Sequence, residues 1–265
     1  MKKFLVIGNP IEHSLSPKLH NYWIKFNNLN AIYEKKKLNT FEIEGLIKEI
    51  KQKKIEGINV TVPFKNLVIP YLDKLSNEAE RTQSVNTIYL KDEILIGHNT
   101  DIVGFESSIK HINYDVSGKK ILLLGAGGVS PSIILALQNM GANKIFLSNR
   151  TQSKAENLKE KFNEIEIIKW GTMPNIDMIV NSTSLGLKKS DNIDIDYSKV
   201  GSDKFFYDVI YNPSETNFLK LAKKYGNKVE NGTLMFIYQA LEAFKLWHGV
   251  EPKVNRDSIK LLSND

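Results

Sequence analysis

The chain has 265 residues, of which 42% are hydrophobic and 25% charged; this composition is typical of a soluble globular protein, and the length favours two domains over one. It has no cysteine, which excludes disulfides and thiolate chemistry, and neither a signal peptide nor an apolar run near the about 20 residues that span a bilayer, so we expect a cytoplasmic protein. The net charge of +6 comes from scattered lysines and short runs such as 51–54 on the polar side of a helix, which favours a solvated surface over a nucleic-acid interface.

The spacing of apolar residues predicts alternating strands and helices. Ser16 and Pro17 are typical of a helix N-cap and first helical residue. The polar segment 113–119 is a candidate domain boundary. In chain order, we expect a strand over 4–8, a helix from 16, a helix around 43–50, a strand from 59, helical segments up to about 84, a hairpin of strands 87–90 and 94–97, a helix over 101–111, strands over 120–124 and 144–148 with a helix between them, strands over 176–180 and 205–209, and a late helix around 235–239.

The most informative stretch runs from Asn59 to Lys65. Side chains alternate across a strand, so Asn59 and Thr61 should share one face while Val60 and Val62 fill the other. Pro63 cannot donate a ladder hydrogen bond and should end the strand, which leaves Lys65 just beyond its C-terminal edge. Ligands of α/β sheets bind at that edge. The row of amide, hydroxyl and ammonium groups therefore predicts a binding site for a small polyhydroxylated or anionic molecule.

A different pattern follows in the second half of the chain. The apolar strand 120–124 runs into GAGGVS at 125–130, a GxGxxG pattern with Ser130 in the third glycine place, and a helix follows from Pro131. The glycines permit a tight turn and the close approach of a pyrophosphate to the helix N-terminus, while the third position needs a small residue for packing. Because strand, helix and second strand come in the right order, we expect dinucleotide binding rather than a plain glycine turn.

Cofactor choice is indicated by the end of the second strand. An NAD site usually places an acidic residue about 20 residues after the glycines. Here Arg150 occupies that neighbourhood, with Lys154 close behind, and a guanidinium suits a 2′-phosphate. The sequence therefore favours NADP over NAD. The alternative is that both cations are simply exposed charges at a helix start.

Short motifs that recur in order along almost the whole chain resemble those of the shikimate dehydrogenase family. They are HSLSP at 13–17, NVTVPFK at 59–65, VNT at 85–87, NTD at 99–101, GAGG at 125–128, NRT at 149–151, NSTSLG at 181–186, DVIYNP at 208–213 and Gln239 in the late helix. Each motif alone is modest evidence, whereas the ordered set is specific.

The resemblance implies an α/β fold with an N-terminal substrate domain on a mixed sheet, a Rossmann-like doubly wound NADP-binding domain, and a cleft between them. The implied bounds are 1–101, completed by C-terminal helices over 233–265, for the substrate domain and 102–232 for the cofactor domain. The implied activity is the reversible, NADPH-dependent reduction of 3-dehydroshikimate to shikimate, a step of chorismate and aromatic amino-acid biosynthesis. A small-molecule substrate, no nucleic-acid or membrane partner, and a monomer or homodimer are expected.

The resemblance also implies roles at the matching motif positions. Lys65 and Asp101 are the implied catalytic residues. The implied substrate-binding residues are Ser14, Ser16, Asn59, Thr61, Lys65, Asn86, Asp101, Tyr211 and Gln239. The implied cofactor-binding residues are Gly125, Ala126, Gly127, Gly128, Val129, Asn149, Arg150, Thr151, Gln152, Ser153, Lys154, Val209 and Gly232. The chain departs from the family at Val129, Ser130 and Pro131, in place of alanines and a basic residue, and at Asn77, in place of an acidic one; these changes bear on cofactor affinity.

The residues themselves support this chemistry. Carbonyl reduction needs a hydride from the cofactor and a proton from a positioned acid. No metal site is expected, because the five histidines are scattered, at 13, 20, 98, 111 and 248. Lys65 remains as the acid, charged at neutral pH and oriented by Asp101. The alternative is that Lys65 and Asp101 form only a surface ion pair.

Two further assignments stay open. Ser14 and Ser16 are expected to hold the substrate carboxylate, although Ser16 alone could be a helix N-cap, and both roles are compatible. The NSTSLG loop should lie at the sheet edge, either as a wall around the nicotinamide or without direct contact.

Three other functions would each account for part of the sequence. A dehydrogenase of dual specificity for quinate and shikimate would share nearly every motif, although Arg150 and the paired serines favour shikimate. A non-catalytic NADP-binding regulatory protein would have no need of the polar set at Lys65, Asn86 and Asp101. A nucleic-acid binder has no recognisable motif in the chain.

Overall fold

The structure, a computed structural model, describes residues 1–262, so the last three residues of the predicted segment 233–265 lie outside it. The chain forms two units, one of residues 1–104 with the C-terminal segment from Ile237, the other of residues 105–236. The junctions fall within two helices, α4 (Asp101–His111) and α9 (Thr233–His248), close to the predicted positions 101/102 and 232/233. The polar segment 113–119 lies inside the second unit, where it turns the chain from α4 into the next strand, so it is not the boundary.

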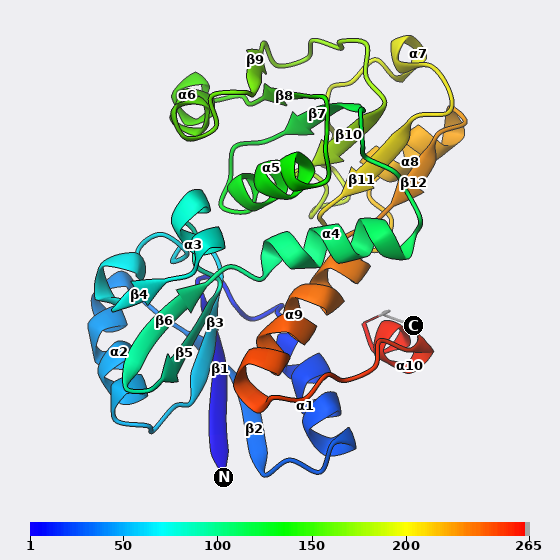
Figure 1. The fold of residues 1–265 in the computed structure, drawn as a ribbon. Helices are drawn as coiled ribbons and strands as arrows, with labels where there is room; N and C mark the ends of the chain where they lie inside the picture. The colour runs from blue at the N-terminus through cyan, green and yellow to red at the C-terminus, as the bar shows by residue number, and fades with distance from the viewer. Residues whose placement is uncertain (263–265) are drawn as a thin grey trace. The chain divides into compact units, whose positions relative to one another are not determined.

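The first unit is built on a six-stranded mixed sheet with strand order β2-β1-β3-β5-β6-β4, as the predicted mixed sheet requires (Figure 1). The pairs β1–β2, β1–β3 and β4–β6 are parallel, whereas β3–β5 and the predicted hairpin β5–β6 are antiparallel. Its elements besides α4 and α9 are β1 (Lys2–Gly8), α1 (Ser16–Phe26), β2 (Ala31–Lys37), η1 (Thr40–Glu42), α2 (Ile43–Lys51), β3 (Gly57–Val60), η2 (Ile69–Tyr71), β4 (Lys74–Leu75), α3 (Asn77–Thr82), β5 (Thr87–Lys91), β6 (Ile94–His98) and α10 (Arg256–Lys260).

The two faces of this sheet bury different helices. Leu5 and Ile58 pack with the apolar side of α2, where Ile43, Leu46, Ile47 and Ile50 are buried. The opposite face carries Phe4, whose ring centroid lies 5.1 Å from that of Trp247 in α9. Figure 1 shows α2 along one face and α1 with α9 along the other. Because side chains alternate along a strand, Asn59 lies on the face opposite Ile58 and Val60.

The informative strand ends earlier than its sequence indicates. β3 stops at Val60, and Thr61 adds one more bond by donating its amide to the Ile7 carbonyl at 2.9 Å. Val62 is 56% exposed rather than part of the core, so its predicted pairing with Val60 on a buried face is wrong. The chain turns before Pro63 because Phe64, which is buried, bonds back to the Thr61 carbonyl. Lys65 nevertheless follows the C-terminal end of the strand, as predicted.

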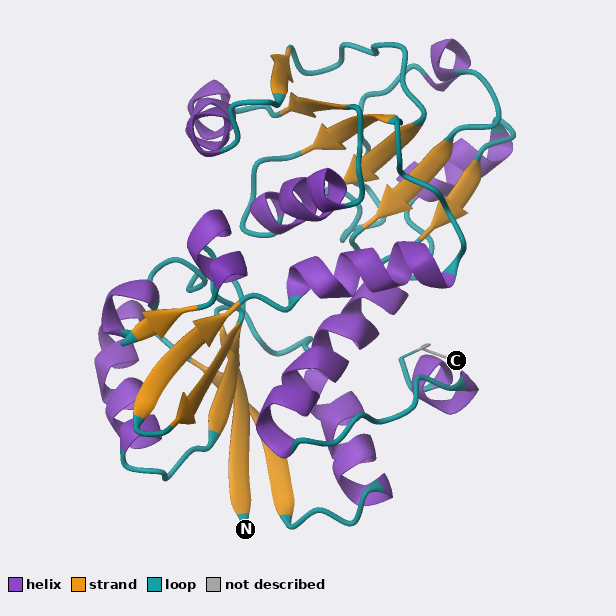
Figure 2. Cartoon of the chain, in the orientation of Figure 1, coloured by secondary structure: helices purple, strands orange, loops and turns teal. Residues whose placement is uncertain are grey.

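The second unit contains a wholly parallel six-stranded sheet in the order β12-β11-β10-β7-β8-β9, whose strands are labelled in Figure 1 and drawn as orange arrows in Figure 2. Counted from β7 as the first strand, this is the order of a doubly wound dinucleotide-binding sheet, with the chain reversing direction across the sheet between β7 and β10. The predicted fold class is confirmed. The elements are β7 (Lys120–Leu124), α5 (Ser130–Asn139), β8 (Lys144–Ser148), α6 (Gln152–Lys161), β9 (Glu166–Ile168), β10 (Met178–Asn181), α7 (Tyr197–Val200), β11 (Phe205–Asp208), α8 (Asn217–Lys224) and β12 (Lys228–Glu230).

The core of this unit explains its layers. Phe218 and Leu219 of α8 pack against Leu122 and Phe206 on one face of the sheet. On the other face, Tyr207 stacks edge-on with Phe105 of α4 at 5.0 Å. Strands buried on both faces read as continuous apolar runs, which is why β7, β10 and β11 were visible in the sequence. Among residues 1–262, no helix has the length and apolarity needed to cross a membrane.

Candidate functional site

Lys65 and Asp101 form a close, largely buried ion pair in the first unit. The Lys65 ammonium lies 2.5 Å from Asp101 Oδ2, and the two side chains are only 13% and 9% exposed. Lys65 sits in the turn after β3, where its carbonyl accepts the Val85 amide at 2.8 Å. Asp101 is the first residue of α4, and the positive end of a helix favours a carboxylate there. The low exposure does not fit the alternative of a surface pair.

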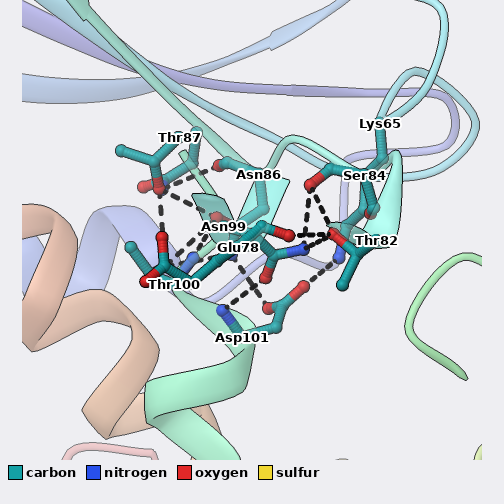
Figure 3. Close-up of polar contacts among 10 residues, drawn as sticks. Lys65, Glu78, Thr82, Ser84, Asn86, Thr87, Asn99, Thr100 and Asp101 are labelled. Atoms are coloured by element: carbon teal, nitrogen blue, oxygen red, sulfur yellow. Dashed lines mark hydrogen bonds and ion pairs between the residues drawn. The ribbon is translucent and has the colours of Figure 1, made fainter. Parts of the chain in front are cut away.

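Asn86 holds the other carboxylate oxygen. Its Nδ2 donates to Asp101 Oδ1 at 2.9 Å and to Thr100 Oγ1 at 3.0 Å, as Figure 3 shows. Its Oδ1 accepts the Thr100 amide at 2.8 Å and the Thr87 hydroxyl at 3.0 Å. Asn86 is 3% exposed, so β5 and the start of α4 are joined by a buried polar contact set. The carboxylate of Asp101 is therefore fixed from both sides.

Asn59 lies next to this set but its amide is already engaged. Its Nδ2 donates to the Asn86 carbonyl at 3.1 Å and to Thr87 Oγ1 at 3.0 Å. Its Oδ1 accepts the Tyr33 hydroxyl at 2.6 Å. An amide nitrogen has two hydrogens, so both are used within the protein and only an oxygen lone pair is left for a ligand.

The start of α1 differs from the predicted cap. Leu15 is the N-cap, and Ser16 is the first helical residue with Pro17 behind it, so the alternative that Ser16 caps the helix is wrong. Instead, the Ser14 hydroxyl accepts the Ser16 amide at 3.3 Å. Ser16 is 7% exposed, and its hydroxyl lies beside Tyr33. Burial raises the pKa of the Tyr33 phenol well above its usual value, and the contact with Ser16 offsets part of that rise.

Sequence reasoning missed several residues of this polar set. Thr87 and Thr100 stand inside the VNT and NTD motifs, which could have signalled them, and both are fully buried. Asn99 accepts the Asp101 amide at 3.1 Å. Tyr33 gave no signal, because β2 was not predicted.

The glycine-rich loop of the second unit has the form expected of a phosphate-binding turn. Gly125 has a φ of +105°, which favours glycine. Gly127 and Gly128 are exposed; a Cβ at Gly128 would meet nothing within 4 Å, and one at Gly127 only a carbonyl at 3.8 Å. The loop thus leaves open space before the N-terminus of α5, which fits a dinucleotide pyrophosphate.

Ser130 has a more specific role than that of a small packing residue. It is fully buried, and its hydroxyl accepts the Gly127 amide at 2.9 Å. It also lies 3.0 Å from the Ser182 hydroxyl of the NSTSLG loop, which donates to the Leu124 carbonyl at 2.8 Å. Ser130 therefore ties the glycine loop to a neighbouring loop.

The predicted 2′-phosphate site forms an exposed cluster at the start of α6. Residues Arg150 to Lys154 are all exposed, and within the part of the chain that the structure describes neither Arg150 nor Lys154 forms an ion pair. Asn149 Oδ1 accepts the Ala126 amide at 3.1 Å and joins this cluster to the glycine loop. Unpaired cations at a helix N-terminus suit an added phosphate better than an unliganded surface.

The loops after β10 and β11 are organised by Asp208. Its carboxylate accepts the Asn181 amide group at 3.0 Å, the Ile210 amide at 3.0 Å and the Thr216 hydroxyl at 2.6 Å. Burial raises the pKa of Asp208 to about 6, against the lowering effect of these three donors. The chain then passes Val209, whose carbonyl would lie 2.1 Å from a Cβ on Gly232, so only glycine permits this close approach.

Two predicted substrate residues lie in separate units. Tyr211, in the second unit, is half-buried with its ring 4.4 Å from that of Phe236. Gln239, in the first unit, is half-buried on α9. The expectation that both face the Lys65 pair across a cleft remains a prediction.

The histidines do not gather at either location. His20 is fully buried against Tyr33, and burial lowers its pKa to about 3. His98 contacts the Ser76 hydroxyl at 2.6 Å. Within residues 1–262, no group of three or more histidine or acidic side chains could hold a metal ion.

Comparison with known proteins finds family models for three stretches of the chain and relatives over nearly its full length. Family models match for the shikimate dehydrogenase substrate binding domain (residues 6–88), shikimate / quinate 5-dehydrogenase (107–192) and the shikimate 5′-dehydrogenase C-terminal domain (232–256). The shikimate dehydrogenase (NADP(+)) of Pelagibacter ubique is 60% identical over 98% of each chain.

Solved structures agree with this match. The shikimate dehydrogenase of Aquifex aeolicus has a TM-score of 0.91 at 39% identity, covering 100% of this chain and 98% of its own. That of Thermus thermophilus, solved with NADP(H) and shikimate, has a TM-score of 0.90 at 31% identity, covering 99% and 98%. Sequence motifs, both sheets and the relatives thus lead to one conclusion: the chain belongs to the shikimate dehydrogenase family.

Proposed function

We propose that this protein catalyses the reversible reduction of 3-dehydroshikimate to shikimate with NADPH, in the biosynthesis of chorismate and the aromatic amino acids. The observation that carries the proposal is the Lys65–Asp101 pair, largely buried and 2.5 Å apart between the turn after β3 and the start of α4. Family membership and the names of relatives at up to 60% identity over nearly the full chain support the substrate and the cofactor.

In this proposal Lys65 is the acid of the reduction. Bound NADPH supplies a hydride to the carbonyl carbon, and the oxygen then needs a proton. An ammonium has three hydrogens, one of which Lys65 donates to Asp101, so others are available for the substrate oxygen. Lys65 gives a proton to the developing alkoxide and, as the neutral amine, takes it back in the oxidation of shikimate.

Asp101 has two functions in the proposal. Its Oδ2 holds the ammonium in place, and its position at the start of α4 keeps the negative charge favourable. Carboxylate oxygens have more lone pairs than Lys65 and Asn86 use, so Asp101 also accepts a substrate hydroxyl.

The remaining substrate contacts are assigned by motif position. Ser14 and Ser16 bind the substrate carboxylate, supported by their place at the start of α1. Ring hydroxyls and the far side of the substrate are bound by Asn59, Thr61, Asn86, Tyr211 and Gln239. Both hydrogens of the Asn59 side-chain amide are donated within the protein. In the proposal Asn59 therefore accepts a hydrogen bond from the substrate and donates none to it.

NADP is assigned to the second unit. The open space before α5 suits the pyrophosphate, and the exposed cations at the start of α6 suit the 2′-phosphate. The proposed contacts are Gly125, Ala126, Gly127, Gly128, Val129, Asn149, Arg150, Thr151, Gln152, Ser153, Lys154, Val209 and Gly232.

An absorbance assay tests substrate and cofactor together. NADPH consumption is measured with 3-dehydroshikimate, and the reverse reaction with shikimate or quinate, each with NADP or NAD. We expect the highest kcat/KM for shikimate with NADP. Comparable rates with quinate would favour the dual-specificity alternative, and no turnover despite NADP binding would favour the regulatory one.

A cytoplasmic location and a monomer or homodimer complete the proposal. The location is supported by a chain of 265 residues without a single cysteine. Light scattering of the purified protein gives the mass of the oligomer, to be compared with the 30.2 kDa chain.

A further inference from the structure

Tyr33 lies outside every motif, yet its hydroxyl starts a chain of hydrogen bonds that ends at Asp101. Tyr33 donates to Asn59 Oδ1 at 2.6 Å, Asn59 Nδ2 donates to Thr87 Oγ1 at 3.0 Å, and Thr87 donates to Asn86 Oδ1 at 3.0 Å. Asn86 Nδ2 then donates to Asp101 Oδ1 at 2.9 Å. All five residues are buried, so water competes little for these bonds.

The direction of every bond in this chain follows from its last member. A carboxylate can only accept, so Asn86 must present its amide hydrogens to Asp101 and its oxygen to Thr87. Thr87 must then donate to that oxygen and accept from Asn59, whose own oxygen is left for Tyr33. Reversing the Asn86 amide would place its oxygen against the carboxylate, and reversing the Asn59 amide would place its nitrogen against the Tyr33 hydroxyl. The Tyr33 hydroxyl is therefore the donor that completes it.

Tyr33 itself is held from several sides. The Asn21 side chain bonds both backbone groups of Tyr33, at 2.7 Å to its carbonyl and 3.0 Å from its amide, and so substitutes for a neighbouring strand at the edge of the sheet. The His20 ring stacks on the phenol ring at 4.1 Å with an interplanar angle of 4°. A side chain fixed in this way is a rigid reference point for Asn59.

We propose that Tyr33 and Thr87 are positioning residues of the reaction: acting through Asn59 and Asn86, they set the place of the Asp101 carboxylate and so of Lys65. The inference rests on the proposed function, because the positions of Asp101 and Lys65 matter for turnover only if these two residues act in the reaction. Thr100 also helps to hold Asn86 in place, because its backbone amide donates to Asn86 Oδ1 at 2.8 Å (Figure 3).

Tyr33→Phe and Thr87→Val test the proposal, since each removes one hydroxyl and keeps the shape of the side chain. Each should lower kcat/KM for shikimate about tenfold, the effect of losing one net hydrogen bond of positioning. NADPH binding, measured by fluorescence, should stay within about twofold of the wild type. Thr87→Ser keeps the hydroxyl and should restore most of the activity.

The double variant separates positioning from a loss of stability. If the hydroxyls act through one chain, the double variant Tyr33→Phe with Thr87→Val should lose about tenfold in kcat/KM in total, as each single variant does. Independent effects would multiply to about a hundredfold. Tyr207→Phe is the matched control, because it removes another fully buried tyrosine hydroxyl, bonded to Ser108 at 2.9 Å in the second unit. Tyr207→Phe should lower Tm by about as much as Tyr33→Phe does and leave kcat/KM for shikimate unchanged.

Single variants with near-normal kcat/KM, or losses that multiply in the double variant, would overturn the positioning role. If Thr87→Val does not fold, Thr87→Ala takes its place in the double variant, because Tyr33→Phe alone also removes the contact with Ser16. A wild-type protein that fails to oxidise shikimate contradicts the proposed function instead, so the two failures are distinguishable.

Discussion

At the residue scale, Lys65 combines a charge with very little solvent. The Lys65 side chain is only 13% exposed and its ammonium lies 2.5 Å from a carboxylate, so water screens its interaction with Asp101 less than it screens an exposed pair. Exposed pairs of the same unit, such as Lys51 with Asp73 at 3.0 Å, are screened by water and contribute little. Lys51 and Lys65 each form an ion pair with an aspartate, but only the Lys65 pair is largely shielded from solvent.

Lys65→Met should therefore lower turnover of shikimate by about 100-fold to 10,000-fold, because it removes the proton donor and keeps the length of the side chain. NADPH binding should change little, since the cofactor is assigned to the other unit. Lys51→Met is the matched control and should retain near-normal turnover. Urea unfolding checks that the unpaired Asp101 carboxylate has not unfolded the protein. A Lys65→Met protein that folds and turns over normally would remove Lys65 from the mechanism.

How far the residues of the site could be predicted depends on where each one stands. Asn86 and Asp101 stand directly at the ends of elements, Lys65 stands in the turn after one, and all three belong to polar motifs that can be recognised in the sequence. The engagement of Asn59 could not be predicted, because its partner Tyr33 lies 26 positions away. Only the parallel register that places Phe4 beside Tyr33 and Val6 beside Asn59 brings the two together.

At the element scale, β2 was missed for a physical reason. Six of its seven residues are exposed or half-exposed, and it runs into the lysines at 35–37. Charges of this kind protect a sheet edge from pairing with another chain, and β2 is an edge strand. The same charges hide the period-two pattern by which a strand is recognised. By contrast, β7 and the hairpin β5–β6 have enough buried residues to be visible in the sequence.

The loops that follow β10 and β11 depend on one buried carboxylate, and its titration should be measurable. Burial raises the pKa of Asp208 from 3.8 to about 6, so between these values the native state binds more protons than the unfolded state. The contribution of Asp208 to stability should therefore be greatest at low pH, fall as pH rises from about 4 to about 6, and stay constant above.

Asp208→Asn removes this titration and keeps the size of the side chain. Relative to the wild type, the free energy of unfolding of the variant should increase as pH rises from 4 to 7, by up to about 3 kcal/mol. Urea unfolding of both proteins at a series of pH values gives this difference directly. A difference that is independent of pH, or that changes in the opposite direction, would contradict the raised pKa.

At the scale of the whole molecule, the chain builds two sheets of different kinds for two ligands. The mixed sheet brings antiparallel β5 beside β3, so that Asn86 and Thr87 lie next to Asn59. The parallel sheet aligns the C-terminal ends of β7, β8, β10 and β11, from which the glycine loop, the Arg150 cluster and the Asp208 loops emerge. The motif order predicted both sheets and placed the junctions at 101/102 and 232/233, a few residues before the positions inside α4 and α9 at which the chain divides. A helix has no composition change at such a point.

Amide hydrogen exchange with single ligands tests this division of labour without relying on turnover. NADP alone should protect amides of the glycine loop over 125–130 and the start of α6, because its phosphates need the donors and cations there. Shikimate alone should protect the turn after β3 and the start of α4, around Lys65 and Asp101. NAD, which lacks the 2′-phosphate, should protect the start of α6 less than NADP does at equal occupancy. Protection of the Lys65 turn by NADP alone, with none at the glycine loop, would reverse the assignment of the two units.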